Sequence, residues 1–155
     1  MFSVLFVCTG NQFRSPIAAE VFRNQLMQDG RIHEWKVSSA GTWTSNGRRL
    51  PAVALELARS FGLDLSGHLT RMIDTSILEE ADLVLVMENG HKESIQVEFP
   101  FARKKVFLLS QVLEGEASEI PDPSKAIDDA KNIIREMIDM IHKGINNIYL
   151  LAEDK

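Results

Sequence analysis

The sequence of 155 residues contains a single cysteine, Cys8, so no disulfide can form within the chain and an all-cysteine metal site is impossible. Such sparing use of cysteine favours a reducing compartment, and we expect a cytoplasmic protein. The histidines are scattered without the spacing of metal ligands, so we expect no bound metal. They lie at His33, His68, His91 and His142.

Long apolar runs and an excess of positive charge are also lacking. No apolar stretch approaches the roughly 20 residues of a membrane-spanning helix, and residues 1–7 lack the basic leader and cleavage site of a signal peptide. The 22 acidic residues outnumber the 17 basic ones, which gives a net charge of −5. Nucleic-acid-binding proteins usually carry a basic stripe. We therefore expect neither a nucleic acid nor a membrane as a partner.

Short apolar runs alternate with helical patterns along the chain. The runs at residues 2–7 and 82–87 predict buried strands, and further strands are predicted at 35–39 and 105–109. Apolar residues at helical spacing predict helices at 16–30, 51–61, 90–98 and 124–151, the last of which is expected to bend or end near Gly144. This alternation predicts one α/β domain over residues 1–155, a three-layer sandwich in which helices cover both faces of a mostly parallel sheet. Ligands of such folds bind beyond the carboxyl ends of the strands.

The segment between the first strand and the first helix reads Cys-Thr-Gly-Asn-Gln-Phe-Arg-Ser-Pro, from Cys8 to Pro16. Ser15 is expected to cap the helix, with Pro16 at its first position. The backbone N–H groups of such a loop can converge on an anion, and the N-terminus of a helix favours negative charge. The planar fork of Arg14 can hold two oxygens of the same anion. The segment therefore predicts a phosphate-sized cradle with the Cys8 sulfur at its floor.

A cysteine in this setting has two interpretations. A lone cysteine after a buried strand is most often a small inert hydrophobic residue. A helix N-terminus and a neighbouring arginine favour the thiolate, which could attack phosphorus while Arg14 and the loop amides stabilise the transition state. Ser15 would then donate a hydrogen bond to the sulfur. The spacing from Cys8 to Arg14, together with Gly10 and the Ser-Pro helix start, favours the nucleophile.

A carboxylate is needed for the rest of such a reaction, first as a general acid and then as a general base. Asp122 is the best candidate because Pro121 and Pro123 flank it and stiffen its loop. The alternative is that Asp122 only caps a turn or the last helix. The cysteine loop favours the catalytic role.

The segment from Cys8 to Pro16 resembles the signature of the low-molecular-weight protein tyrosine phosphatase family. Further similar segments follow in the family's order, at residues 39–42 (Ser-Ala-Gly-Thr), 62–71, 86–88 (Val-Met-Glu) and 122–123 (Asp-Pro), so that the resemblance covers nearly the whole chain. It implies a four-stranded parallel sheet of the flavodoxin-like, phosphotyrosine phosphatase I-like type, with no metal or cofactor.

The resemblance also implies a role for each residue of the site. Cys8 would be the nucleophile, Arg14 the phosphate clamp and Asp122 the general acid and base. Ser15 would hydrogen-bond the sulfur, and His68 would support the loop unless it is merely an exposed loop histidine. The phosphate-binding loop would consist of Thr9, Gly10, Asn11, Gln12, Phe13 and Arg14, with Asn11 holding it in a strained shape.

The chain departs from the family pattern at several positions. Phe13 stands where the family often has a second cysteine, so a protective disulfide in the loop is impossible. Ser124 replaces an aromatic residue that commonly follows Asp-Pro. Trp43 lies about two positions before the usual cleft tryptophan, so it either lines the mouth of the site or packs on the surface. Gln12 matches neither the apolar residue of phosphotyrosine-specific members nor the threonine of phosphoarginine-specific relatives.

The preferred function is therefore a protein phosphatase that acts on a phosphorylated protein, with phosphotyrosine as the first choice of substrate and a monomer or weak dimer as the working form. A phosphoarginine phosphatase and a thiol-dependent arsenate reductase on the same fold are alternatives. The reductase normally passes oxidation along further cysteines, and this chain has only Cys8. A non-catalytic anion-binding module is the third alternative, and it would predict the loss of Cys8, Arg14 or Asp122.

Overall fold

A computed structural model describes residues 1–123 and 126–154. The strands β1 (Phe2–Cys8), β2 (Trp35–Gly41), β3 (Leu83–Val86) and β4 (Val106–Leu108) form one parallel sheet in the order β2-β1-β3-β4. This confirms the predicted α/β fold with a four-stranded parallel sheet. Because β2 pairs on one side of β1 and β3 on the other, the chain changes direction at the carboxyl end of β1. A crevice opens at such a switch point, and the Cys8 loop begins there.

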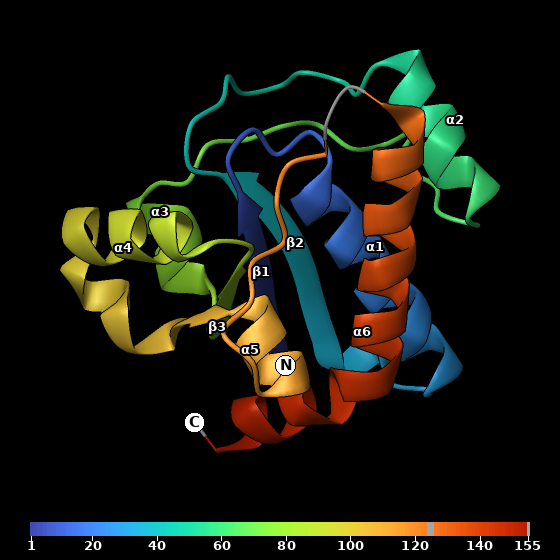
Figure 1. The fold of residues 1–155 in the computed structure, drawn as a ribbon. Coiled ribbons are helices and arrows are strands. Elements are labelled where there is room, and N and C mark those ends of the chain that lie inside the picture. The colour runs from blue at the N-terminus through green and yellow to red at the C-terminus, as the bar shows by residue number, and fades with distance from the viewer. Residues whose placement is uncertain (124–125, 155) are drawn as a thin grey trace.

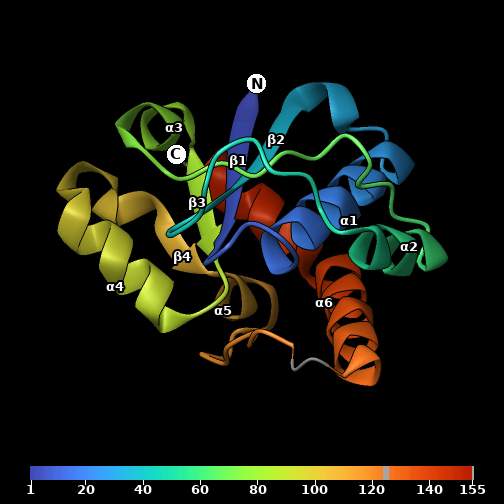
Figure 2. The same cartoon turned by 90° about the horizontal axis from the view of Figure 1, so that it is seen from above.

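Helices cover both faces of the sheet. They are α1 (Arg14–Gln28), α2 (Ala52–Ser60), α3 (Thr75–Glu80), α4 (Asn89–Glu98), α5 (Leu109–Glu114) and α6 (Ile127–Glu153), with short 3₁₀ turns at Ile32–Glu34 and Pro100–Lys105. Figure 1 and Figure 2 show α3 and α4 on one side of the sheet and α1 and α6 on the other. Within the described ranges, no helix is long and apolar enough to cross a membrane.

The side chains of β1 alternate between the two faces of the sheet. Val4 and Phe6 pack in the core that includes α1 and α6, whereas Leu5 and Val7 pack in the core that includes α3 and α4. Because both faces are covered, the strand reads as one continuous apolar run. The same alternation assigns Cys8 to the α1 side, so its sulfur lies next to the start of that helix.

The start of the first helix differs from the prediction. Helix α1 begins at Arg14, and Phe13 occupies the capping position without a side-chain hydrogen bond. Ser15 is therefore not the cap that its sequence context predicted. Its hydroxyl group lies instead between Cys8 and Asn11, because those buried polar groups offer it contacts inside the fold.

The other differences concern short elements and helix ends. Helices α3 and α5 were not predicted because six residues are too few to show a helical period. Leu109, expected in the fourth strand, is the first residue of α5, which follows β4 without a loop. The predicted start of the last helix at Ser124 lies outside the described residues, and α6 runs from Ile127 to Glu153.

Helix α6 does not end at Gly144, although its ribbon changes direction toward the C-terminal end (Figure 1). A Cβ atom at Gly144 would lie 2.5 Å from the carbonyl oxygen of Leu113 and 2.9 Å from its Cα. Glycine is therefore needed here because the backbone of α5 packs directly against α6.

Candidate active site

The loop after β1 turns sharply at Asn11, which has a φ of 55°. This left-handed conformation is uncommon for any residue but glycine. The buried Asn11 side chain donates to the hydroxyl oxygens of Ser15 (2.9 Å) and Ser39 (3.0 Å) and accepts from the N–H of Arg71 (3.0 Å). These bonds join the loop to α1, to β2 and to the segment before α3, and they hold the turn in place.

His68 contacts the same turn from outside. Its Nε2 lies 2.9 Å from the carbonyl oxygen of Asn11. Because a carbonyl oxygen can only accept, Nε2 carries a proton and donates it. Burial lowers the pKa of His68 and favours the neutral ring, while this hydrogen bond acts in the opposite direction. The structure thus places His68 against Asn11, the position that the family resemblance implied for it.

The segment after β2 lies directly beside the loop. The N–H of Thr42 donates to the carbonyl of Cys8 (2.9 Å), and the N–H of Trp43 donates to that of Thr9 (3.0 Å). A Cβ atom on Gly41 would overlap the Thr9 carbonyl oxygen and lie 3.1 Å from the backbone nitrogen of Asn11. Glycine at position 41 therefore allows the close approach of two backbone segments.

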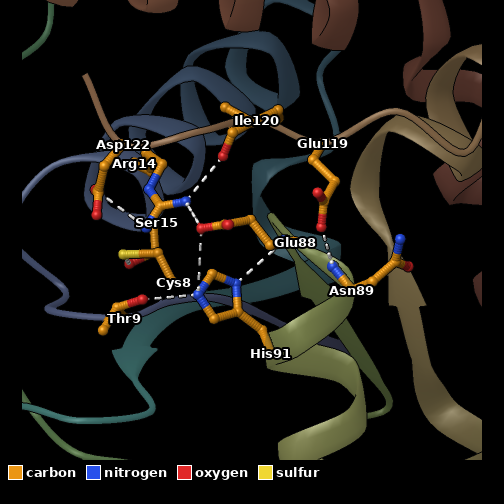
Figure 3. A network of polar contacts seen from close by, with 10 residues as sticks. All are labelled: Cys8, Thr9, Arg14, Ser15, Glu88, Asn89, His91, Glu119, Ile120 and Asp122. Atoms are coloured by element: carbon orange, nitrogen blue, oxygen red, sulfur yellow. Dashed lines mark hydrogen bonds and ion pairs between the residues drawn. The ribbon is translucent and has the colours of Figure 1, made fainter. Parts of the chain in front are cut away.

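The Cys8 sulfur lies at the base of this loop. Cys8 is 2% exposed, and its Sγ is 3.0 Å from the hydroxyl oxygen of Ser15 (Figure 3). That oxygen already accepts a hydrogen bond from Asn11, so its own proton can point to the sulfur. The carbonyl of Ala40, at 3.4 Å, is the weaker alternative acceptor.

The loop also offers backbone donors. Among the described residues, the N–H groups of residues 10 to 13 have no acceptor. Unpaired amides at the start of a helix form a favourable environment for an anion. The predicted phosphate-binding segment is therefore a loop whose amides remain free for a ligand.

Arg14 is completely buried, and the two halves of its guanidinium group differ in their partners. Nη1 donates to a carboxylate oxygen of Glu88 (2.5 Å) and to the carbonyl oxygen of Ile120 (2.8 Å). Nε and Nη2 have no hydrogen-bond partner in the part of the chain that the structure describes. These two nitrogens form one edge of the planar group, the edge that can bind two oxygens of one anion.

Asp122 lies beside that free edge. Its Oδ1 is 3.0 Å from Nη2 of Arg14, which makes an ion pair, but the N–H bond does not point at the carboxylate. The contact is therefore an ion pair without a hydrogen bond, because a hydrogen bond requires the N–H to point at the acceptor. The Asp122 side chain is 71% exposed, so it can turn toward a ligand in the cleft.

A cleft of about 530 Å³ opens above the sulfur. Cys8, Thr9 and Gly10 line its base, and Asp122 lies at its edge. Apart from the polar Gln12, its walls are apolar, and they are formed by Phe13, Pro51, Val53, Ala54, Leu57, Pro123, Ala126, Ile127 and Ala130. Ser124, which replaces the family's aromatic residue, lies outside the described residues.

A second hollow of about 390 Å³ adjoins the loop on its other side. Gln12 and Trp43 both line it, and Trp43 is 77% exposed. Trp43 thus lies on the surface beside this second hollow and does not line the cleft that contains Cys8. Gln12 is exposed, and Phe13 is half-buried beside the main cleft.

Two residues of this site were missed by the sequence reasoning. Glu88 lies directly after β3, and His91 follows in the first turn of α4. Figure 3 shows both beside Arg14 and Thr9. The position of Glu88 could have indicated its role, because it is an acidic residue just after the carboxyl end of a central strand, where ligands of such folds bind.

In the described ranges, no group of three or more His, Cys, Asp or Glu residues could hold a metal ion.

The sequence matches the family described as low molecular weight phosphotyrosine protein phosphatase over residues 3–154. A Klebsiella pneumoniae protein assigned as a low molecular weight protein-tyrosine-phosphatase is 39% identical over 140 residues, which cover 90% of this chain and 92% of that protein. The protein-arginine-phosphatase of Bacillus subtilis (strain 168) is 31% identical over 150 residues, covering 90% and 97%. A solved structure of the YwlE arginine phosphatase, a Cys-to-Ser mutant whose active-site serine is phosphorylated, superposes with a TM-score of 0.85 at 30% identity and covers 92% of each chain.

The close approach at Gly41 leads to a prediction. In Gly41→Ala, the added methyl group should push the Thr9 carbonyl away and distort the loop, because a backbone contact cannot yield as a side chain can. We expect inorganic phosphate to bind at least about tenfold more weakly, a change of about 1.4 kcal/mol. Isothermal titration calorimetry with phosphate measures this change.

Gly67→Ala is the matched control, because nothing lies within 4 Å of a Cβ atom there. It should bind phosphate as the unmodified protein does. Equal affinity of both variants for phosphate would show that the loop does not depend on the contact with Gly41.

Proposed function

Since the chain belongs to the low molecular weight phosphotyrosine protein phosphatase family, we propose that it removes phosphate from phosphorylated protein side chains. Cys8, Arg14 and Asp122 would carry out this hydrolysis in two steps. The reaction requires a reduced sulfur, and we place the protein in the cytoplasm. Its partner would be a phosphorylated protein, which it would meet as a monomer or weak dimer.

The observation that carries this proposal is the free edge of Arg14. A completely buried guanidinium with two nitrogens that lack hydrogen-bond acceptors is costly unless a ligand satisfies them. A phosphoryl group matches this edge because two of its oxygens can accept in parallel from Nε and Nη2. The free amides of residues 10 to 13 would bind the remaining oxygen.

In the first step, the Cys8 thiolate attacks phosphorus opposite the leaving group. A sulfur–phosphorus bond forms as the bond from phosphorus to the substrate side chain breaks, and Asp122 donates its proton to the departing atom. The Ser15 hydroxyl, 3.0 Å from the sulfur, would stabilise the thiolate. Arg14 and the amides would stabilise the charge on the three equatorial oxygens.

In the second step, a water molecule attacks the cysteinyl phosphate. Asp122 takes a proton from this water, the sulfur–phosphorus bond breaks, and inorganic phosphate leaves with Cys8 again a thiolate. The exposed position of the Asp122 carboxylate, in the cleft that Cys8 also lines, is compatible with both proton transfers. The phosphorylated serine of the YwlE mutant supports a covalent intermediate at this position.

The cleft walls support phosphotyrosine as the substrate. Aliphatic side chains such as Pro51, Val53 and Ile127 line it, and a flat aromatic ring can bury its faces against them. A phosphoarginine side chain would bring a polar guanidinium group between these walls. Because the chain is also similar to a protein-arginine-phosphatase, phosphoarginine is the second candidate.

The remaining alternatives have less support. Arsenate reduction would leave Cys8 oxidised, and the chain has no second cysteine to resolve it, so an external thiol would be needed. A non-catalytic module would not need the sulfur, the arginine edge and the carboxylate in one place. All three lie together in this chain.

Cys8→Ser should lose turnover of an aryl phosphate by more than about a thousandfold, because a hydroxyl is a far weaker nucleophile than a thiolate. Calorimetry should still detect phosphate binding, since Arg14 and the amides remain. Slow phosphorylation at position 8, detected by mass spectrometry, would agree with the covalent route. Turnover at the rate of the unmodified enzyme would exclude that route.

Asp122→Ala should affect substrates according to their leaving groups. We expect kcat for a poor leaving group, phenyl phosphate, to fall about 100-fold, and kcat for the activated p-nitrophenyl phosphate to fall less. Glu116→Gln is the control, because it removes an exposed acid from the same segment. An equal loss for both substrates would mean that Asp122 does not protonate the leaving group.

A panel of peptides that differ only in the phosphorylated residue tests the substrate. We expect kcat/KM for the phosphotyrosine peptide to exceed that for the phosphoarginine peptide by at least about tenfold, and that for phosphoserine by more, because only the ring fills the aliphatic cleft. Phosphate release measures the rates. A preference for phosphoarginine would assign the chain to the second candidate.

A further inference from the structure

We propose that His91 is a positioning residue that couples Thr9 of the phosphate-binding loop to Glu88, the carboxylate that orients Arg14. This inference rests on the proposed function, because it concerns the same oxyanion site. It adds a connection that runs from the loop, across the carboxyl ends of β1 and β3, to the guanidinium group.

His91 is 6% exposed, and both of its ring nitrogens have partners (Figure 3). Nε2 lies 2.8 Å from the hydroxyl oxygen of Thr9, and Nδ1 lies 3.1 Å from the backbone nitrogen of Glu88. A backbone N–H can only donate, so Nδ1 must be an acceptor without a proton. The neutral ring then carries its proton on Nε2 and donates it to Thr9.

This assignment determines the direction of the Thr9 hydroxyl. Because its oxygen accepts from His91, its own proton points elsewhere, and Thr9 lines the cleft above Cys8. The hydroxyl can therefore donate to an oxygen ligand in that cleft. Without His91, the hydroxyl could rotate, and its donation to a ligand would no longer be fixed in advance.

The same residue holds Glu88 at two points. The His91 ring accepts from the Glu88 N–H, and the Glu88 carboxylate accepts from the His91 backbone, which together form a capping box at the start of α4. An oxygen of this carboxylate binds Nη1 of Arg14 at 2.5 Å. Since Nη1 is held in this way, the opposite edge of the guanidinium group lies beside Asp122, which lines the cleft.

The protonation state of His91 decides whether this connection exists. Burial, and then the charge of Arg14, lower the pKa of His91. The carboxylates of Glu88, Asp122 and Glu119 act in the opposite direction. The lowered pKa keeps the ring neutral at neutral pH. As the pH falls through that value, Nδ1 gains a proton and can no longer accept from the Glu88 N–H.

A simpler role for His91 is that of a helix cap alone. His91→Asn separates the two roles. The oxygen of the asparagine side chain can accept from the Glu88 N–H, but the side chain is too short to reach Thr9. Thr9→Val removes the same contact from the other side and preserves the shape of the side chain. Thr9→Ser retains a hydroxyl and is the control for that substitution.

We expect His91→Asn to raise the inhibition constant of inorganic phosphate and to lower kcat/KM for p-nitrophenyl phosphate about tenfold. In a Thr9→Val background, the same substitution should have less than a twofold effect, because the contact is already lost. Thr9→Ser should retain more of kcat/KM than Thr9→Val, because it keeps a hydroxyl that His91 can contact. Equal effects of His91→Asn in both backgrounds would overturn the coupling.

The pH dependence gives an independent readout. The ratio of kcat/KM between the unmodified enzyme and His91→Asn cancels titrations that both share. We expect this ratio to be about ten at pH 7–8 and to fall toward one below the ordinary imidazole pKa of about 6.5. A helix cap alone predicts a ratio near one at neutral pH and below one in acid, and that result would refute the proposal.

Calorimetric titration with inorganic phosphate keeps this test separate from the catalytic one. If the unmodified protein binds phosphate but hydrolyses no substrate, the proposed function fails while the coupling can still be measured. If His91→Asn is too unstable to purify, Thr9→Val and Thr9→Ser decide the matter. Equal phosphate affinity of these two variants would overturn the inference.

Discussion

The site depends on the burial of one positive charge. Arg14 is completely buried, and a buried guanidinium is unfavourable unless its donors are satisfied and its charge is balanced. Glu88 and the Ile120 carbonyl satisfy one side, and they come from positions 74 and 106 residues further along the chain. Their geometry leaves the other edge of the group without hydrogen-bond partners among the described residues, beside the Asp122 carboxylate. The same interactions that stabilise the charge therefore define where an oxyanion can bind.

A second constraint acts on the opposite side of the loop. Asn11 adopts a left-handed conformation, and such strain persists only where the surroundings hold it. Its side chain bonds to Ser15 and Ser39 and accepts from the Arg71 N–H, while Gly41 allows the neighbouring backbone to approach. The loop is thus held from the β2 side by Asn11. On the β3 side it is held through Arg14.

Local patterns were sufficient to predict most of the fold. Strands β1 and β3 are short, mostly apolar runs that lie in the middle of the sheet, and the long helix α6 repeats its apolar residues at helical spacing, so each could be identified from neighbouring residues. The prediction failed where a side chain had a stronger distant partner. Ser15 has the sequence context of a helix cap, but Asn11 and Cys8 engage its hydroxyl inside the fold. The six-residue helices α3 and α5 were too short to show a period.

The sequence by itself determined the order of strand, loop and helix around Cys8, because β-propensity, Gly10 and Pro16 act over a few residues. It also placed Cys8, Arg14 and Asp122 among the candidates. Only the tertiary structure decided which edge of Arg14 stays free and that His91 connects Thr9 with Glu88. The reason is physical: the direction of these hydrogen bonds depends on atoms that come together only when β1 and β3 pair. Local sequence patterns therefore cannot predict them.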